Sequence, residues 1–487
     1  MNVGAVFYVL GRLSILLGWL LAAPTLLAIA DGGLDHDVTH AFFVTAAVSF
    51  GIGVALRFSF RFDAAEFGFG EAFATVTFSW LLFTALGALP FLLTGAIDGV
   101  LDASFEVLSG FTTTGASVLD DPALLGRPLL FWRAMTQWIG GLGIVALSVA
   151  VLPALGAGGN FLFQAEMPGP ESEKLMPRIS STSKLLWSVY LGLTGAQFLA
   201  LWAAGMTPFD SICHTFTTLS TGGFGTRADS VAGFGPAVQW ILIAFMFVAG
   251  INFVMLFNLL RRRAGVLLRN TEVRVYTGIT VGVTALCALV VWQQGAPGAA
   301  RGFEPLVRDA AFTTTTLITS TGFVSTDYSL WPPLLHVVLM LVMLVGACAG
   351  STGGGVKVIR LVLLFKDCMR EIQRLLRPRA VVLVKVGHRP VSDNIMDHTI
   401  GYFTLYFASL IVLTLVLMVL GLTTETSFSA VLSCLSNMGP GFGDVGPVSN
   451  YGHLPETGKL LLMLAMLLGR LEFYSVIVLF LPLAWRR

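Results

Sequence analysis

The amino-acid sequence predicts an all-α polytopic membrane protein, and three observations point to this fold class. First, 55% of the 487 residues are hydrophobic and only 12% are charged, with a mean hydropathy of +0.81, whereas soluble proteins carry about 25% charged residues. Second, ten apolar stretches are long enough to span a bilayer as helices, which takes about 20 residues. Third, four segments rich in Ser, Thr and Gly interrupt the apolar pattern at matching places.

The ten predicted transmembrane helices form an N-terminal pair followed by four further pairs. In chain order they cover residues 5–30, 40–57, 70–95, 128–152, 184–205, 236–260, 275–293, 333–365, 397–421 and 458–484. The first stretch ends like a signal peptide. It is longer than a typical signal core, however, and holds Arg12 inside it, so we expect a retained helix.

Each Ser/Thr/Gly segment lies between the two helices of one pair. The segments are SGFTTTGAS around Gly115, TTLSTGGFGT around Gly222, TLITSTGFVST around Gly322 and LSCLSNMGPGFG around Gly439. Non-helical backbone persists at membrane depth only where protein buries it or water reaches it. Because internal repetition marks a transport path, the pattern predicts four pseudo-fourfold helix–pore loop–helix repeats around one pore.

The chain therefore divides into an N-terminal helix pair outside the repeat and four pore repeats. The predicted ranges are 1–66 for the N-terminal pair and 67–155, 156–262, 263–380 and 381–487 for repeats one to four, with a gating loop at 346–355 inside repeat three.

Backbone carbonyls around the four glycines are expected to coordinate a monovalent cation. Glycine adopts positive φ without a side-chain clash, and a ring of carbonyl oxygens can replace the hydration shell of an ion. None of these positions is charged, which suits a weakly hydrated ion. The expected filter residues are Thr113, Thr114, Gly115 and Ala116; Ser220, Thr221, Gly222 and Gly223; Ser320, Thr321, Gly322 and Phe323; and Asn437, Met438, Gly439 and Pro440.

A further glycine-rich segment, GACAGSTGGGVK, interrupts the eighth predicted helix. Each glycine costs a helix interior about 1 kcal/mol, so the helix should break there. The segment superficially resembles a nucleotide-binding loop, but its spacing and its helical flanks do not fit one. We expect a gate, with a flexible kink as the simpler alternative. The expected gate residues are Gly346, Gly350, Gly353, Gly354, Gly355 and Lys357, together with Arg470.

Arg470 lies in the middle of the last predicted helix, and an ionisable residue at that depth is a candidate functional residue. Glu472 is a poor partner for it, because residues two apart do not share a helix face. A structural ion pair between Arg470 and Glu106, or another buried acidic residue, is the alternative. Lys357 and Arg360, near the cytoplasmic end of their helix, could simply extend to the membrane surface.

The distribution of Lys and Arg sets the predicted orientation. One set of connecting segments holds 19 of these residues and the other set holds 6. The first set, with both termini, is therefore expected in the cytoplasm, and the four glycine loops enter from outside. In the longest cytoplasmic loop, KDCMREIQRLLR reads as a basic amphipathic helix and AVVLVKV as a short strand.

The sequence offers no constellation for catalysis or for cofactor binding. The five cysteines are scattered, with no histidine at ligand spacing, which argues against zinc and against a disulfide framework. We find no nucleophile–base arrangement and no paired catalytic carboxylates. An enzyme activity, a transition metal, a cofactor bound by this chain and a nucleic-acid partner are therefore not expected.

Several stretches resemble the Trk/Ktr/HKT superfamily of potassium transporters. They are ALPFLL, SGFTTTGAS, QWIGGLGI, FQAEMPGP, STGGF, GACAGSTGGGVKVIRLVLLFK and GRLEFYSVIVLFLP, and they extend over nearly the whole chain. The extra N-terminal helix pair resembles the Trk branch of the superfamily. The resemblance implies a potassium filter at Gly115, Gly222, Gly322 and Gly439, an intramembrane gating loop at 346–355 and a pore-lining role for Arg470.

The resemblance also implies a setting and partners. It implies a homodimer in the bacterial inner (cytoplasmic) membrane, bound to a cytosolic TrkA-type regulatory subunit that carries NAD(H) or ATP/ADP. The basic segments 261–274 and 366–389 are the expected docking surfaces. The expected function is channel-like potassium uptake. The alternative is a proton- or sodium-coupled symporter on the same fold, for which Glu106 is the titratable candidate.

Overall fold

The computed structural model describes residues 1–61, 67–141, 143, 179–260, 264–295, 301–379, 382–387 and 389–482. The four predicted boundaries between domains fall at or beside residues outside these ranges. Three other predicted features also lie outside the described residues. They are most of the second half of the predicted helix 128–152, the FQAEMPGP stretch and the basic residues 261–263.

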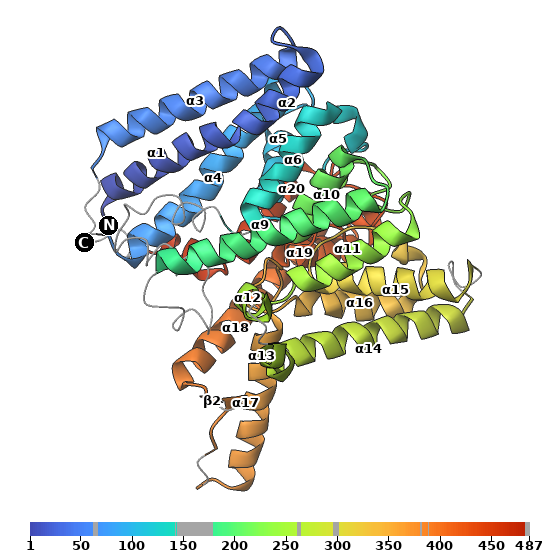
Figure 1. Ribbon diagram of the computed structural model, residues 1–487. Helices are drawn as coiled ribbons and strands as arrows, with labels where there is room; N and C mark the ends of the chain where they lie inside the picture. Colours follow the sequence, from blue (N-terminus) through green and yellow to red (C-terminus); the bar gives the residue numbers. More distant parts are fainter. Residues whose placement is uncertain are drawn as a thin grey trace.

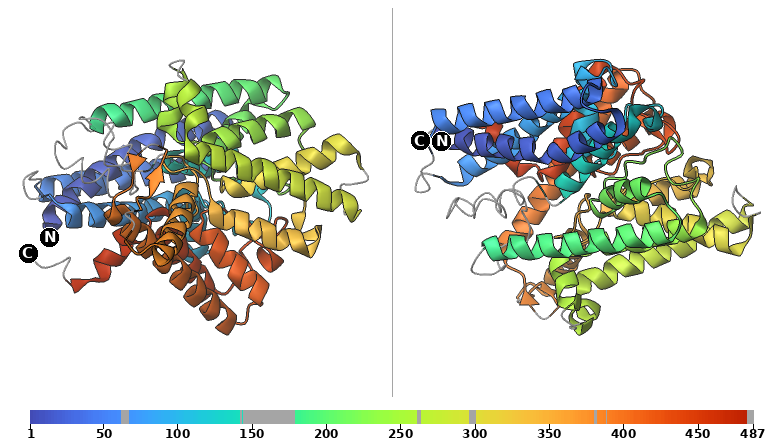
Figure 2. Two further views of the ribbon diagram at one scale, coloured as in Figure 1. Left: turned by 90° about the horizontal axis from the view of Figure 1, so that it is seen from below. Right: turned by 45° about the horizontal axis from the view of Figure 1, so that its top comes forward.

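The N-terminal part forms a helical pair at one side of the molecule (Figures 1 and 2). Its first member is α1 (Val3–Leu20) continued by α2 (Ala22–Gly32), and its second is α3 (Asp37–Ser59). Helices α1 and α3 approach closely at two glycines. A Cβ added to Gly11 would lie 2.9 Å from the Gly53 carbonyl oxygen, and one added to Gly53 would lie 2.8 Å from that of Gly11. Small residues at such a contact allow membrane helices to pack backbone against backbone.

Four sets of helices follow, and each contains a short helix that ends at a Ser/Thr/Gly segment. The first set comprises α4 (Phe69–Leu93), α5 (Val100–Phe111), η2 (Pro122–Leu125) and α6 (Gly126–Gly141), and the second comprises α9 (Ile179–Ala203), α10 (Pro208–Leu219), α11 (Pro236–Ala249), α12 (Phe253–Leu260) and α13 (Ala264–Arg269). The third comprises α14 (Thr271–Gln293), α15 (Phe303–Ile318), η6 (Tyr328–Leu330), α16 (Pro333–Val345) and α17 (Val358–Leu376). The fourth comprises α18 (Asp393–Val419), α19 (Thr424–Leu435), η7 (Gly443–Val445), α20 (Glu456–Arg470), α21 (Tyr474–Ile477) and η8 (Val478–Phe480).

Three of the predicted transmembrane helices are broken. The break of the eighth, between Val345 and Val358, is where its glycine content predicted it. The predicted continuous helices 236–260 and 458–484 are wrong, because α11 and α12 are bent by 107° and α20 and the segment after it by 114°. Among the described residues, six helices are long and apolar enough to span a membrane, or eight if each bent pair counts as one. The predicted count of ten is not reached there, since α6 ends at the limit of a described range and α16 has only 13 residues.

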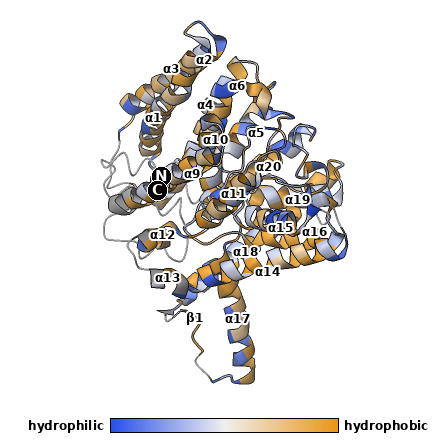
Figure 3. Cartoon of the chain, turned by 45° about the vertical axis from the view of Figure 1, so that its right-hand side comes forward, coloured by the Kyte–Doolittle hydropathy of each residue, from blue (hydrophilic) through white to orange (hydrophobic). Residues whose placement is uncertain are grey.

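The third set ends in α17, which extends beyond the other helices and carries hydrophilic residues along its length (Figures 1 and 3). This confirms the predicted amphipathic continuation of the eighth helix. Of the predicted strand AVVLVKV, only the last two residues form a strand among those described. They are β1 (Lys385–Val386), which pairs antiparallel with β2 (Arg389–Pro390).

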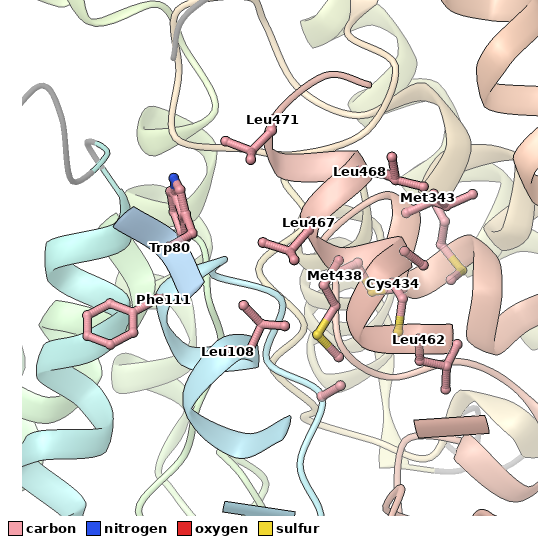
Figure 4. Close-up of a cluster of buried hydrophobic side chains, with 14 of the residues drawn as sticks. Trp80, Leu108, Phe111, Met343, Cys434, Met438, Leu462, Leu467, Leu468 and Leu471 are labelled. Atoms are coloured by element: carbon pink, nitrogen blue, oxygen red, sulfur yellow. The ribbon is translucent and has the colours of Figure 1, made fainter. Parts of the chain in front are cut away.

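A buried apolar cluster lies between the first and fourth sets, close to the fourth glycine loop (Figure 4). Trp80 of α4 and Phe111 of α5 lie on one side of it, and Met438 and Leu467 on the other. All four side chains are buried. Because protein interiors are close-packed, this cluster gives the loop a rigid support.

Candidate ion pathway

The four Ser/Thr/Gly loops share one backbone conformation. Each turns left-handed two residues beyond its short helix and again at a glycine two residues later. The first left-handed residues are Thr113, Thr221, Ser320 and Asn437, with φ of +56°, +56°, +54° and +49°, and the glycines are Gly115, Gly223, Gly322 and Gly439, with φ of +80°, +74°, +81° and +99°. A left-handed residue other than glycine costs of order 1–3 kcal/mol. Because the four lie at matching positions, the surrounding structure must hold all four loops in this one conformation.

The register of the second loop differs by one residue from the predicted one. The left-handed glycine there is Gly223, so the equivalent triplet is Thr221-Gly222-Gly223 and not Ser220-Thr221-Gly222. The amides of Gly222 and Gly223 both bond to the Thr217 carbonyl, at 2.9 and 3.1 Å. Helix α10 thus sets the register, and Gly222 does not occupy the place of Gly115, Gly322 and Gly439.

The loops adjoin one another in cyclic order. A Cβ added to the left-handed glycine of one loop would meet a carbonyl oxygen of the next. These contacts run from Gly115 to the Gly222 oxygen, from Gly223 to that of Thr321, from Gly322 to that of Met438 and from Gly439 to that of Thr114. The first loop meets the second, the second the third, the third the fourth and the fourth the first. The result is a closed ring of backbone with no room for side chains at these glycines.

A cavity of about 120 Å³ opens on one side of this ring. All four left-handed glycines line it, together with Arg133 and Tyr451. The segments that follow the glycines, including Phe224 and Pro440, complete its wall.

A buried ion pair binds the residues that follow the first two loops. Arg133 Nε lies 2.6 Å from Glu106 Oε1, and both side chains are almost fully buried. Arg133 also donates to the Gly225 carbonyl at 3.0 Å and to Ser117 Oγ at 3.2 Å. Its guanidinium lies 3.5 Å from the centroid of the Phe224 ring. Glu106 is therefore engaged by Arg133, and its predicted alternative pairing with Arg470 is wrong.

Gln137, one helical turn from Arg133 on α6, supports the second loop. Its amide nitrogen donates to the Gly222 carbonyl at 2.7 Å, and its oxygen accepts from the Phe224 amide at 3.1 Å. Neither Arg133 nor Gln137 was among the predicted site residues. Two polar residues four apart in an apolar helix share one face, which is the signal that could have found them.

The glycine-rich segment crosses the other side of the ring, beneath the ends of the short helices. Thr352 Oγ1 donates to the carbonyl of Leu219, the last residue of α10, at 2.9 Å. The Gly354 amide donates to Ser320 Oγ at 2.5 Å, and a Cβ on Gly354 would overlap the Ser436 carbonyl. The segment thus touches the ends of α10, α15 and α19.

Backbone turns give the segment its compact form. Gly346, Gly350 and Gly355 have φ of +72°, +71° and +77°, and Lys357 has φ of +78°. Lys357 Nζ donates to the Gly353 carbonyl, so its ammonium group folds back onto the segment.

Glu272, at the start of α14, binds both this segment and the helix that follows it. Its Oε1 accepts from the amide of Ala349 at 2.7 Å and from that of Ile359, in the first turn of α17, at 3.2 Å. The carboxylate is buried. A buried carboxylate at a helix N-terminus is a favourable arrangement, and this one joins three elements.

The break between α11 and α12 binds the same segment. The Cys348 amide donates to the Gly250 carbonyl, and the Phe253 amide to the Gly350 carbonyl, each at 3.0 Å. Asn252 donates to the Ala349 carbonyl at 2.8 Å. The two irregular stretches thus satisfy each other's backbone groups, as buried backbone requires.

Arg470 links the first loop to the glycine-rich segment. Its guanidinium donates to Thr113 Oγ1 at 3.3 Å, to the Thr352 carbonyl at 3.2 Å, and to the carbonyls of Gly140 and Gly141 at 2.5 and 3.0 Å. The predicted site residue Arg470 therefore does lie with the predicted loops.

Glu472 pairs with Arg360 of α17, across the break that follows α20. The alternative in which Arg360 simply extends to the membrane surface is wrong, because its side chain is buried and its guanidinium lies 4.0 Å from the Tyr402 ring centroid. Glu472 and Phe473 have φ of +53° and +63°, so the backbone is not helical there. Helical spacing therefore does not determine which residues the Glu472 side chain can contact.

Apolar helices of membrane-spanning length around a buried ring of loops define a membrane transport protein. Residues 38–485 match the family model of TrkH, described as a cation transport protein. The chain belongs to the TrkH family, which confirms the resemblance seen in its sequence.

Named relatives match the chain over most or all of its length. It is 38% identical to the Trk system potassium uptake protein TrkH of Salmonella typhimurium, over all of both chains. It is 37% identical to the Trk system potassium uptake protein TrkG of Escherichia coli, over 91% of each chain. The crystal structure of the potassium transporter TrkH from Vibrio parahaemolyticus superposes with a TM-score of 0.88 at 34% identity, covering all of both chains.

Proposed function

We propose that this protein takes up potassium through a channel-like pore in the bacterial inner membrane. The observation that carries the proposal is the closed ring, in which each left-handed glycine abuts a carbonyl of the next loop. Rings of carbonyl oxygens replace the hydration shell of a monovalent cation, and no residue of the ring is charged. Full-length similarity to proteins named for potassium uptake supports potassium as the ion.

The selectivity filter is formed by one stretch from each of four pseudo-fourfold repeats, in a fold of ten transmembrane helices with an extra N-terminal pair. The ion-binding stretches are Thr113–Ala116, Ser320–Phe323 and Asn437–Pro440, with Thr221–Phe224 as the equivalent stretch of the second repeat. Ser220 stands one position earlier and corresponds to Thr112, Thr319 and Ser436.

The segment 346–355 acts as the gate, in a closed position beneath the filter. Its contacts with the ends of α10, α15 and α19 support this role. Arg470 is the pore-lining cation at the same level, and Lys357 closes the segment on itself. Moving the segment would remove the obstruction below the ring.

The protein acts as a homodimer with both termini in the cytoplasm. A cytosolic TrkA-type subunit binds the basic surface around α13 and α17 and controls the gate. Any nucleotide, NAD(H) or ATP/ADP, belongs to that subunit, and potassium is the ligand of this chain.

Passive conduction is favoured over proton- or sodium-coupled symport because Glu106, the titratable candidate for coupling, is engaged in a buried pair with Arg133. The test is flux in proteoliposomes that contain only this protein, with K⁺ or Na⁺ gradients imposed separately at clamped pH. We expect flux that follows the K⁺ gradient, and a loss of that flux in Gly322→Ser, whose Cβ would overlap the Met438 carbonyl of the fourth loop. A requirement for an H⁺ or Na⁺ gradient would favour the symporter instead.

A further inference from the structure

The carbonyl of Gly439, in the fourth loop, differs from its three counterparts. Ser433 Oγ donates a hydrogen bond to it at 2.6 Å, and the Tyr451 hydroxyl donates another at 2.7 Å. Both side chains are buried. A backbone carbonyl has two acceptor lone pairs, so both are occupied by hydroxyl groups of the protein.

The counterparts in the other loops are free of such bonds. None of the hydrogen bonds among the residues that the structure describes ends on the carbonyl oxygens of Gly115, Gly223 or Gly322. The four glycines stand at the same place in their loops and line the same cavity. The ring is therefore symmetric in its backbone and asymmetric in the oxygens that it can offer to an ion.

The hydroxyl before the fourth loop does not explain the difference by itself. Ser109, Thr217 and Thr316 occupy the position of Ser433 at the ends of their own helices, since their carbonyls accept the same loop amides. Ser109 Oγ and Thr316 Oγ1 are buried without a partner among the described residues, and Thr217 Oγ1 donates back into α10. Tyr451 is the feature that the fourth loop adds.

Tyr451 is held in place by contacts other than the one to Gly439. Its amide donates to the Ser117 carbonyl at 2.8 Å, just beyond the first loop. Its ring packs against Phe105 of α5, with centroids 5.7 Å apart. These contacts fix the position of the Tyr451 ring and hence of its hydroxyl.

We infer that the Gly439 carbonyl is not an ion ligand, and that three carbonyls, those of Gly115, Gly223 and Gly322, coordinate the cation at this level of the ring. The inference rests on the potassium filter proposed above. Discrimination between ions depends on the number and field strength of the coordinating carbonyls. Tyr451 is thus a specificity-determining residue that keeps the ring one ligand short and limits its preference for K⁺ over Na⁺.

The test compares Tyr451→Phe with Tyr328→Phe in the proteoliposome flux assay. Tyr328 is also buried, but its hydroxyl lies 3.5 Å from the carbonyl of Gly441, outside the ring. In Tyr451→Phe one lone pair of Gly439 is released, and we expect the K⁺/Na⁺ flux ratio to rise about threefold, the low end of what one neutral hydrogen bond is worth. Tyr328→Phe should keep the wild-type ratio.

Ser433→Ala is a second, independent variant that releases the other lone pair, and we expect its ratio to rise as well. Ratios that stay unchanged or fall in both Tyr451→Phe and Ser433→Ala, while K⁺ flux continues, would overturn the inference and leave the proposed function intact. A wild-type protein whose flux does not respond to a K⁺ gradient would overturn the proposed function and this inference together.

Discussion

In the proposed gate, replacing Glu272 by alanine should weaken the closed position of the glycine-rich segment. The carboxylate accepts from two buried amides, those of Ala349 and Ile359, and these bonds join the segment to α14 and to the start of α17. Alanine offers no acceptor, so both amides lose a charged partner in a place where burial leaves no full replacement by water.

The magnitude follows from those two bonds. A hydrogen bond to a charged group contributes about 1.5–3 kcal/mol, so the closed position loses at least about 3 kcal/mol. A shift of that size changes the ratio of open to closed segments by about 100-fold. Asn252 and Thr352 still hold the segment, so the closed position remains populated. Glu272→Gln keeps one carbonyl oxygen as an acceptor and should show a smaller effect.

The assay is K⁺ flux into proteoliposomes without any partner subunit, in parallel with thermal unfolding in detergent. We expect partner-independent flux to rise by up to about 100-fold in Glu272→Ala. Glu371→Ala, which removes an exposed glutamate of α17, is the matched control and should behave as the wild type. A Glu272→Ala protein that stays folded and conducts no faster than wild type would refute this account of the segment as a latch.

Three further outcomes are expected. Gly223→Ala should abolish K⁺ flux, because its Cβ overlaps backbone of the third loop. Gly222→Ala should retain part of the flux, because its Cβ meets a side chain that can move. Equal flux in the two variants would contradict the register described here. Arg133→Met should lower the midpoint of thermal unfolding, since the buried Glu106 carboxylate loses a partner worth about 3–5 kcal/mol, and adding Glu106→Gln should restore part of it; a double variant no more stable than the single would argue against this. Gly53→Leu should also lower that midpoint by separating α1 from α3, while the K⁺/Na⁺ flux ratio stays at the wild-type value; a changed ratio would link the N-terminal pair to the filter.

The four loops and the break of the eighth helix could be predicted because their cause is local. Runs of Ser, Thr and Gly have a low propensity to form a lipid-facing helix, and this does not depend on the neighbouring segments. The register of the second loop could not be predicted in the same way. Gly222 and Gly223 are equally able to turn left-handed, and the choice is made by where the α10 hydrogen-bond pattern ends.

The partners of the buried charged residues could not be predicted from the sequence, for a different reason. Arg133 and Glu106 are 27 residues apart, and Arg360 and Glu472 are 112 apart, so their pairing depends on the packing of whole helices. Glu472 is a poor partner for Arg470 only as long as the helix continues beyond Arg470. Left-handed residues after Arg470 end that helix, and spacing rules stop applying there.

One polypeptide supplies all four walls of the ring. In an assembly of four identical subunits, a substitution would alter every wall at once, and an unfavourable change would be repeated fourfold. Here a substitution alters only one of the four walls. The residues that precede the four left-handed glycines already differ, and they are Thr114, Gly222, Thr321 and Met438. If the ring is the proposed filter, its ion preference can therefore change in small steps, one wall at a time, without a simultaneous change in the rest.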